Sequence, residues 1–410
     1  MAIKWKDRFE PSHVIDRIAS VRTYSEDGKA SYSGFVVDEC MPTLNSMLKF
    51  PPAAADIDQE TLVWRALNRA GKELTPESFL RAANDELSAR LKTKEVTYSV
   101  LTSISISPDK LLKSISLLGC KIQLLNGDFQ KKFRPHRSNQ IKEYRTDISD
   151  TPSDYCKVVV TVLAKSPGAA FHKAMRSVDL MRSLMCLMSN PRMQITMGRV
   201  SHEAVNVVSL GGHHTVHLAD GKSAREGYWY EPYFKPKSLH KPDKPDLMSK
   251  NIRWATRRIN SSNFGKAMVC SLLMFVRGLD LHDHNAAFLK VWAALEMLTT
   301  PNQADYDKLI RRSVFLFNEV KYQRQVLEHL RMYRNANVHA GEESENARIH
   351  CYQLQTFYSA IIWFCIRNGS NFSNLEDLGD FLDLPSEPIA LEQRLKQIRR
   401  AIKFRKPSVS

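Results

Sequence analysis

The 410-residue sequence lacks the usual marks of a secreted or membrane-spanning chain. Its seven cysteines form no C-x-x-C pair and mostly stand inside apolar runs, which indicates reduced core residues. No apolar run approaches the ~20 residues that a membrane-spanning helix needs. Residues 1–8 contain no apolar signal segment. We therefore expect a soluble, cytoplasmic protein with no membrane partner.

Positive charge is in clear excess. Lysine and arginine number 59 against 44 aspartates and glutamates, a formal net charge of +15. The hydrophobic content of 43% and the charged content of 25% are ordinary for a globular protein with a sizeable core. The excess favours a polyanionic partner, for which RNA is the natural candidate, although many solvated proteins also carry basic surfaces.

The spacing of apolar residues divides the chain in two and predicts an α+β protein. Residues 1–235 mix helical spacing with alternating, strand-like segments, so we predict a mixed α/β domain. Residues 236–245 are rich in proline and lysine, which favours an extended linker. Residues 246–410 are helical throughout and predict a bundle. Its helices are expected at about 246–260, 263–279, 283–299, 304–317, 321–338 and 345–366.

A short glycine pair suggests a hairpin in the first domain. Residues 205–210 and 213–218 flank Gly211-Gly212, a two-residue turn that would join them as antiparallel strands. On such a strand His213 and His214 point to opposite faces, and His217 lies about 13 Å beyond His213. This geometry argues against a zinc site, and we expect no metal.

One hexapeptide carries a set of side chains suited to phosphodiester chemistry, Arg334-Asn335-Ala336-Asn337-Val338-His339. On a helix, Asn335 and His339 share one face, and the long Arg334 side chain can reach the same point. Arginine binds a phosphate in bidentate fashion, and histidine transfers protons near neutral pH. The alternative is that both residues only cap the helix end or interact with its dipole.

This R-x4-H pattern, with an apolar helix containing Trp292 and Glu296 before it and Ala340-Gly341 after it, resembles the HEPN superfamily of ribonucleases. Residues 246–365 look like an ApeA-type HEPN domain of the bacterial anti-phage group. The resemblance implies a metal-independent endoribonuclease without a cofactor, in which His339 is the general acid/base, Arg334 binds the scissile phosphate and Asn335 positions it. It also implies a homodimer through the HEPN domain and cleavage of cellular RNA, possibly tRNA, in abortive infection.

By the same analogy, residues 1–235 would sense a phage-derived activator. Glu296 is expected to support the site, because a carboxylate at the edge of an apolar stripe is costly to bury unless it is paired. Arg334 is its expected partner. The other interpretation is a glutamate that reaches solvent.

Two further basic segments are candidate contacts for RNA. In residues 127–145, lysines and arginines alternate with aromatic residues, a mixture that suits single-stranded nucleic acid, although a solvated loop has the same composition. Its candidate RNA-binding residues are Lys131, Lys132, Arg134 and Arg137.

The C-terminal segment predicts a basic amphipathic helix with Leu391, Leu395, Ile398 and Ile402 on one side. It could bind nucleic acid, a partner groove or a membrane surface, or dock on its own bundle. For the whole chain, the competing function is a non-catalytic HEPN module that binds RNA or protein.

Overall fold

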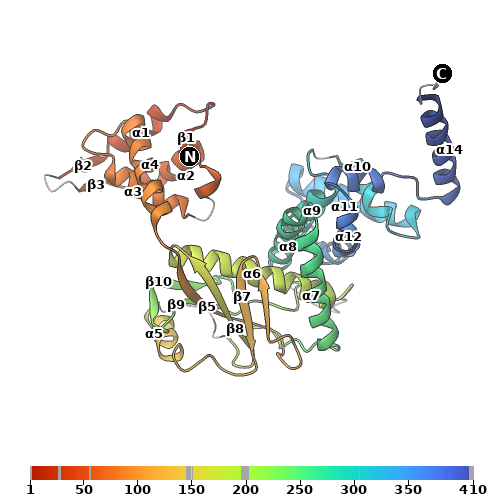
Figure 1. Ribbon diagram of the computed structural model, residues 1–410, viewed down its shortest axis with the longest axis horizontal. Helices are drawn as coiled ribbons and strands as arrows, with labels where there is room; N and C mark the ends of the chain where they lie inside the picture. The colour runs from red at the N-terminus through yellow and green to blue at the C-terminus, as the bar shows by residue number, and fades with distance from the viewer. Residues whose placement is uncertain are drawn as a thin grey trace, which may run out of the picture.

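The computed structural model describes residues 2–25, 29–54, 57–144, 149, 151–194, 203–303 and 305–405. It is a mixed α+β protein, as expected. Figure 1 shows three regions in chain order: a small helical unit, a sheet crossed by one long helix, and a group of helices that ends in a separate C-terminal helix.

The first region has its own apolar core. Asp58 caps one of its helices by accepting from the Thr61 N–H, and Thr75 with Ser78 forms a capping box on the next. Its buried residues, among them Ile15, Leu44 and Phe79, form a cluster distinct from the core of the rest of the chain. The helices are α1 (Pro11–Ala19), α2 (Val36–Met47), α3 (Gln59–Arg69) and α4 (Pro76–Lys92). The short strands are β1 (Lys4–Trp5), β2 (Arg22–Tyr24), β3 (Ala30–Tyr32) and β4 (Leu48–Lys49).

The second region is a six-stranded antiparallel sheet with strand order β10-β9-β5-β8-β7-β6. Val100 lies opposite Val160 on one side and Val216 on the other, so β-branched side chains fill the centre of one face. The strands are β5 (Val96–Ile104), β6 (Ser114–Leu117), β7 (Cys120–Leu125), β8 (Cys156–Ala164), β9 (His213–Leu218) and β10 (Ser223–Tyr230).

Different elements cover the two faces of the sheet. Helix α6 (Pro167–Ser189) packs on the face that carries Val100 and Val160. On the opposite face, Phe129 and Phe133 are buried against Leu101 and Val159, next to helix α5 (Arg134–Tyr144). Alternation along β5 and β8 therefore places apolar side chains on both faces.

The third region is helical, and all six predicted helices are present within a few residues of their expected ends. They are α7 (Pro245–Ser261), α8 (Gly265–Leu279), α9 (His284–Thr299), α10 (Tyr306–Val314), α11 (Val320–Ala340) and α12 (Ala347–Asn368), followed by α13 (Leu375–Leu382) and α14 (Pro388–Arg405). Residue 304, the expected first residue of one helix, lies outside the described residues. None of the described helices combines the length and the apolar character needed to cross a membrane.

The proline- and lysine-rich segment 236–244 is extended but fixed to the sheet region. Lys237 Nζ donates to the carbonyl oxygens of Ala204 and Asn206 at 2.5 and 2.8 Å. His240 exchanges backbone hydrogen bonds with Ser105 and Ser107. One continuous apolar cluster joins α6 and the sheet to the C-terminal helices, so the break in the core lies between α4 and β5.

The predicted hairpin around Gly211-Gly212 is wrong. Strand β9 instead forms a hairpin with β10, which follows it, and Leu210 only bridges Ile104. Gly211 is needed for a different reason. Its N–H donates to the Ser103 carbonyl, and an added Cβ would lie 2.1 Å from Ser103 Oγ. The glycine therefore permits a close backbone approach rather than a turn.

Candidate functional site

The R-x4-H residues lie in the last two turns of α11. Arg334 and Asn335 are half-buried, whereas His339 is exposed. Gly341 follows with a φ of 67°, and this left-handed residue ends the helix by turning backbone N–H groups back toward Ala336 and Asn337. The motif therefore sits at an open helix end with a defined stop.

The guanidinium of Arg334 is positioned by contacts that leave its charge unneutralised. Its Cζ lies 4.9 Å from the centre of the Tyr306 ring, and Nη1 donates to Asn335 Oδ1 at 3.3 Å. Arg331, one turn earlier, instead forms an ion pair with Asp307 at 2.6 Å. Among the described residues, no carboxylate pairs with Arg334. Its charge is therefore available to an anionic ligand.

The expected ion pair between Glu296 and Arg334 is absent from the described part of the chain. Glu296 Oε1 instead accepts from Trp292 Nε1 at 2.9 Å. Trp292 packs edge-on against Tyr306 with ring centres 6.1 Å apart. Glu296 is thus linked to Arg334 only through two aromatic rings, so any support that it gives is indirect.

His339 and Asn335 are four residues apart on α11, which places their Cβ atoms about 5–6 Å apart. Arg334 is five residues before His339, a rise of about 7.5 Å along the helix axis. A phosphate group bridging the arginine and the histidine would therefore lie beside Asn335. This set can bind an anion and move a proton.

A histidine pair joins α11 to α12 before the motif begins. His329 Nε2 is 3.3 Å from His350 Nε2, and His350 packs on Tyr333 with ring centres 4.4 Å apart. Burial, with the neighbouring His329, lowers the pKa of His350 to about 4. Tyr333 also hydrogen-bonds Asn285 on α9. These contacts anchor α11 to the bundle just before the motif begins.

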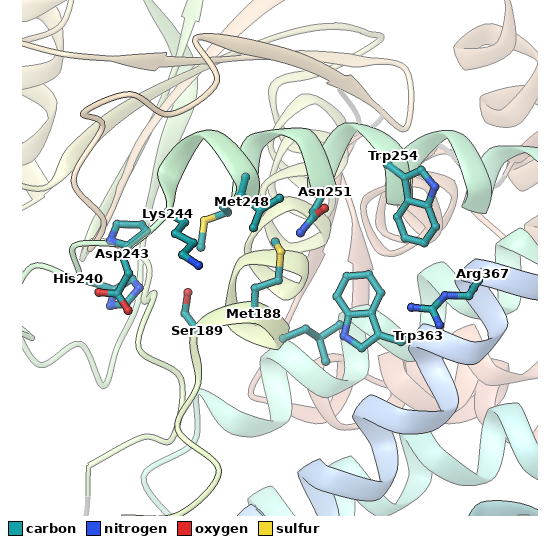
Figure 2. Close-up of a pocket in the computed structure, with 13 residues that line it drawn as sticks. Met188, Ser189, His240, Asp243, Lys244, Met248, Asn251, Trp254, Trp363 and Arg367 are labelled. Atoms are coloured by element: carbon teal, nitrogen blue, oxygen red, sulfur yellow. The ribbon is translucent and has the colours of Figure 1, made fainter. Parts of the chain in front are cut away.

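Three cavities of about 800 to 870 Å³ open on the described surface, and the R-x4-H residues line none of them. Figure 2 shows the cavity of about 870 Å³, in which Met188 and Met248 lie in the middle. Trp254, Trp363 and Arg367 form one end. His240, Asp243 and Lys244 form the other. The exposed His339 therefore lies outside these three cavities.

A buried charge network, which sequence reasoning missed, joins the sheet to the C-terminal helices. Arg182, fully buried on α6, forms ion pairs with Asp179 and Asp280, each at 2.7 Å. Arg277 on α8 bridges Asp179 and Glu231 at 2.5 and 3.2 Å. The available signal was Asp179 and Arg182, spaced i, i+3 within the mainly apolar second half of the helix.

Part of this network lines the cavity of about 840 Å³, which contains Glu231, Arg277 and Asp280. Burial alone raises the pKa of Glu231, but His214 and Arg277 outweigh it and hold that pKa at about 2. His214 Nε2 lies 3.4 Å from Glu231. Because each of these charges already has a partner, the network is arranged for stability.

The four candidate RNA-binding residues of segment 127–145 do not form one surface. Lys131, Lys132 and Arg134 are exposed. Arg137 is buried and donates to Leu101 O, His213 O and Thr215 Oγ1. Burial lowers its pKa to about 10. The expectation for Arg137 is therefore wrong, since its donors are used within the protein.

The structure also corrects the expected role of the aromatic residues in this segment. Phe129 and Phe133 are buried against the sheet and have no face free to stack on a base. Tyr144 is exposed and stacks on Tyr228 with ring centres 4.9 Å apart. Residue 145, the last of the expected loop, lies outside the described residues.

Among the described residues, no group of three or more histidine, cysteine, aspartate or glutamate side chains could hold a metal ion. Comparison with protein-family models, curated proteins and solved structures finds no match to this chain.

Proposed function

We propose that the protein is a metal-independent endoribonuclease whose site is the end of α11. Arg334 binds the scissile phosphate, Asn335 orients it, and His339 acts as general acid/base. The observation that carries the proposal is the state of Arg334, half-buried over Tyr306 without a carboxylate partner among the described residues, on the helix end that exposes His339. Glu296 supports the site through Trp292 and Tyr306.

The chemistry needs only these side chains and the substrate. The imidazole of His339 removes the proton of an RNA 2′-hydroxyl, whose oxygen then bonds to the adjacent phosphorus. The bond from phosphorus to the 5′-oxygen breaks, and that oxygen takes the proton that His339 has accepted, which returns the imidazole to its starting state. The products are a 2′,3′-cyclic phosphate and a 5′-hydroxyl. The guanidinium of Arg334 stabilises the negative charge that builds on the phosphoryl oxygens.

A single motif on an open helix offers few contacts to an RNA strand. Two large apolar side chains next to the motif on α11 are exposed, with relative exposures of 72% for Met332 and 46% for Val338. Exposed apolar side chains of this size favour a protein partner. We propose that a second copy covers them and brings a second motif to the same RNA strand.

The biological setting proposed here rests on the resemblance of the motif to HEPN ribonucleases. The enzyme would cut cellular RNA, such as tRNA, during abortive infection, and residues 1–235 would respond to a phage-derived activator. The net charge of +15 favours a polyanionic substrate in general.

The test is cleavage of total RNA by purified protein in EDTA, with the wild type compared with Arg334→Ala and His339→Ala. We expect each substitution to lower the rate by about 10²-fold or more, since general acid–base catalysis contributes 10²–10⁴-fold. Arg324→Ala, an exposed arginine on the same helix, is the matched control and should cleave normally.

Growth on expression is the second readout, because it does not require the activator to be known in advance. Toxicity that His339→Ala relieves supports the nuclease. RNA that all variants bind equally and leave intact, together with toxicity that survives His339→Ala, would favour the non-catalytic binding module.

A further inference from the structure

Helix α14 contributes no residue to the core of the molecule. None of its residues is buried, and Figure 1 shows it standing apart from the other helices. Leu395, Ile398 and Ile402 have relative exposures of 47, 48 and 52%. The expectation that this helix docks on its own bundle is therefore wrong. Its apolar side chains are left for a partner outside the chain.

The spacing of those side chains identifies the kind of partner. Leu391, Leu395, Ile398 and Ile402 follow one another at intervals of four, three and four residues, the seam of a coiled coil. On a helix they fall within a stripe about 60° wide. A helix that lies on a broad apolar surface needs a stripe of about 100° or more. The narrow stripe therefore fits a single partner helix.

We propose that α14 pairs in antiparallel orientation with α14 of a second copy. In that arrangement Leu395 packs against Ile398 of the second copy, and Leu391 packs against Ile402. The same register places Pro388 opposite Arg405, which are the two ends of the helix. One register therefore aligns the apolar seam and both helix ends together.

The charges beside the seam select this orientation. In the antiparallel pair, Glu392 lies next to Arg399 of the second copy, and Arg394 lies next to Ala401. In a parallel pair, Arg394 would face Arg399, a like-charge contact repeated on both sides. The antiparallel pair thus has two attractive contacts at its edges where the parallel pair has two repulsive ones.

Of the remaining basic residues, Arg405 lies at the helix end, opposite Pro388 of the second copy, and the other three do not oppose the pairing directly. Lys396, Arg400 and Lys403 lie 100° or more around the helix from Leu391 and point away from the seam. Antiparallel helices also place the positive end of each dipole beside the negative end of the other. The helix has 18 residues, a length of about 27 Å, so the pairing is expected to be weak and to depend on concentration.

Sedimentation velocity of the full chain over a range of concentrations tests the proposal. The seam variant Leu395→Asp/Ile398→Asp should weaken self-association by at least tenfold. Ile389→Asp/Phe404→Asp is the matched control, because Ile389 and Phe404 are the most exposed apolar residues of α14 and lie off the seam. That control should associate like the wild type. Since α14 has no buried residue, neither variant should alter the thermal melt.

A charge exchange at low salt tests the orientation. Arg399→Glu places a glutamate beside Glu392 of the second copy and should weaken association. The double variant Glu392→Arg/Arg399→Glu should restore it. Stronger association of Arg399→Glu alone would indicate parallel helices and overturn the proposal.

Two other results would also overturn the proposal. One is a wild type that stays monomeric at every concentration. The other is equal association of the seam variant and its control, which includes a dimer made wholly through another surface. The proposal is independent of the ribonuclease activity, so RNA cleavage can fail while this pairing stands.

Discussion

Two groups of polar side chains in this molecule both contain arginine and histidine but have different surroundings. At the junction of α6, α8 and β9, arginines and carboxylates form a chain of ion pairs around the fully buried Arg182. His214, whose pKa is lowered by burial, lies beside Glu231 in this chain. At the end of α11, Arg334, Asn335 and His339 share one weak hydrogen bond and an aromatic contact. The first group is enclosed and fully paired, whereas the second is open.

This difference separates side chains that stabilise the fold from side chains that are available to a ligand. A buried charge is tolerated only when partners replace the water it has lost, so each member of the junction network depends on the others. A half-exposed arginine without an acid partner costs little to the fold and can exchange water for a ligand. Substitutions at the junction should therefore change the stability of the protein, and those on α11 should change its chemistry.

The largest expected effect is at Arg182. Arg182→Ala leaves the buried Asp179 and the partly buried Asp280 without their common partner, and breaking a buried pair in this way costs about 3–5 kcal/mol. Urea unfolding measures the loss. Arg176→Ala, an exposed arginine on the same helix, is the control and should stay within about 0.5 kcal/mol of the wild type. A small effect of Arg182→Ala would show that the junction does not depend on these pairs.

The next prediction compares two basic residues of the segment 127–145. Arg137→Ala removes charge-assisted hydrogen bonds to Leu101, His213 and Thr215 and should destabilise the fold by about 1.5–3 kcal/mol. Lys131→Ala, at an exposed site, should leave the unfolding free energy unchanged. Equal stability of the two variants would contradict this structural role and would make Arg137 a candidate RNA contact again.

Arg137 also illustrates what sequence reasoning could and could not reach. Helical periodicity predicted all six helices from α7 to α12, because it records which face of each helix is buried. It could not separate Arg137 from Lys131, since both belong to one basic run. Their difference arises from β5 and β9, strands far from them in sequence, which supply the carbonyl oxygens.

Part of the candidate site could be predicted from the sequence, because that part depends on local helical spacing. The placement of Arg334, Asn335 and His339 at one helix end follows from local spacing and is present. The partner of Arg334 is set by tertiary packing, which brings Tyr306 to the guanidinium. Glu296 instead accepts from Trp292, which lies four residues earlier on the same helix. The hairpin prediction failed because Gly211 allows the backbone to lie close to Ser103, a contact that the local sequence does not encode.

A pH effect should appear where α11 meets the bundle. The folded pKa of His350 is about 4, below the usual value of 6.5, so the unfolded chain binds more protons between these limits. Stability from this residue is complete above about pH 6.5 and is lost as the pH falls toward 4. The urea midpoint of the wild type should therefore fall from pH 7 to pH 4.5 by more than that of His350→Gln. His13→Gln, at an exposed histidine, should follow the wild type. Parallel curves for all three proteins would contradict the role of His350.

The smallest expected effect is at Tyr306, which contacts Arg334. Its ring holds the Arg334 guanidinium without neutralising it, a contact worth about 0.5–1 kcal/mol at a partly exposed position. Tyr306→Ala should therefore weaken RNA binding by about two- to fivefold while the cleavage rate of bound RNA changes little. Tyr306→Phe keeps the ring and should bind RNA like the wild type. Equal losses in the alanine and phenylalanine variants would assign the effect to the hydroxyl group. An unchanged affinity in both would mean that Arg334 needs no aromatic support, and α11 would then be even less constrained than its contacts indicate.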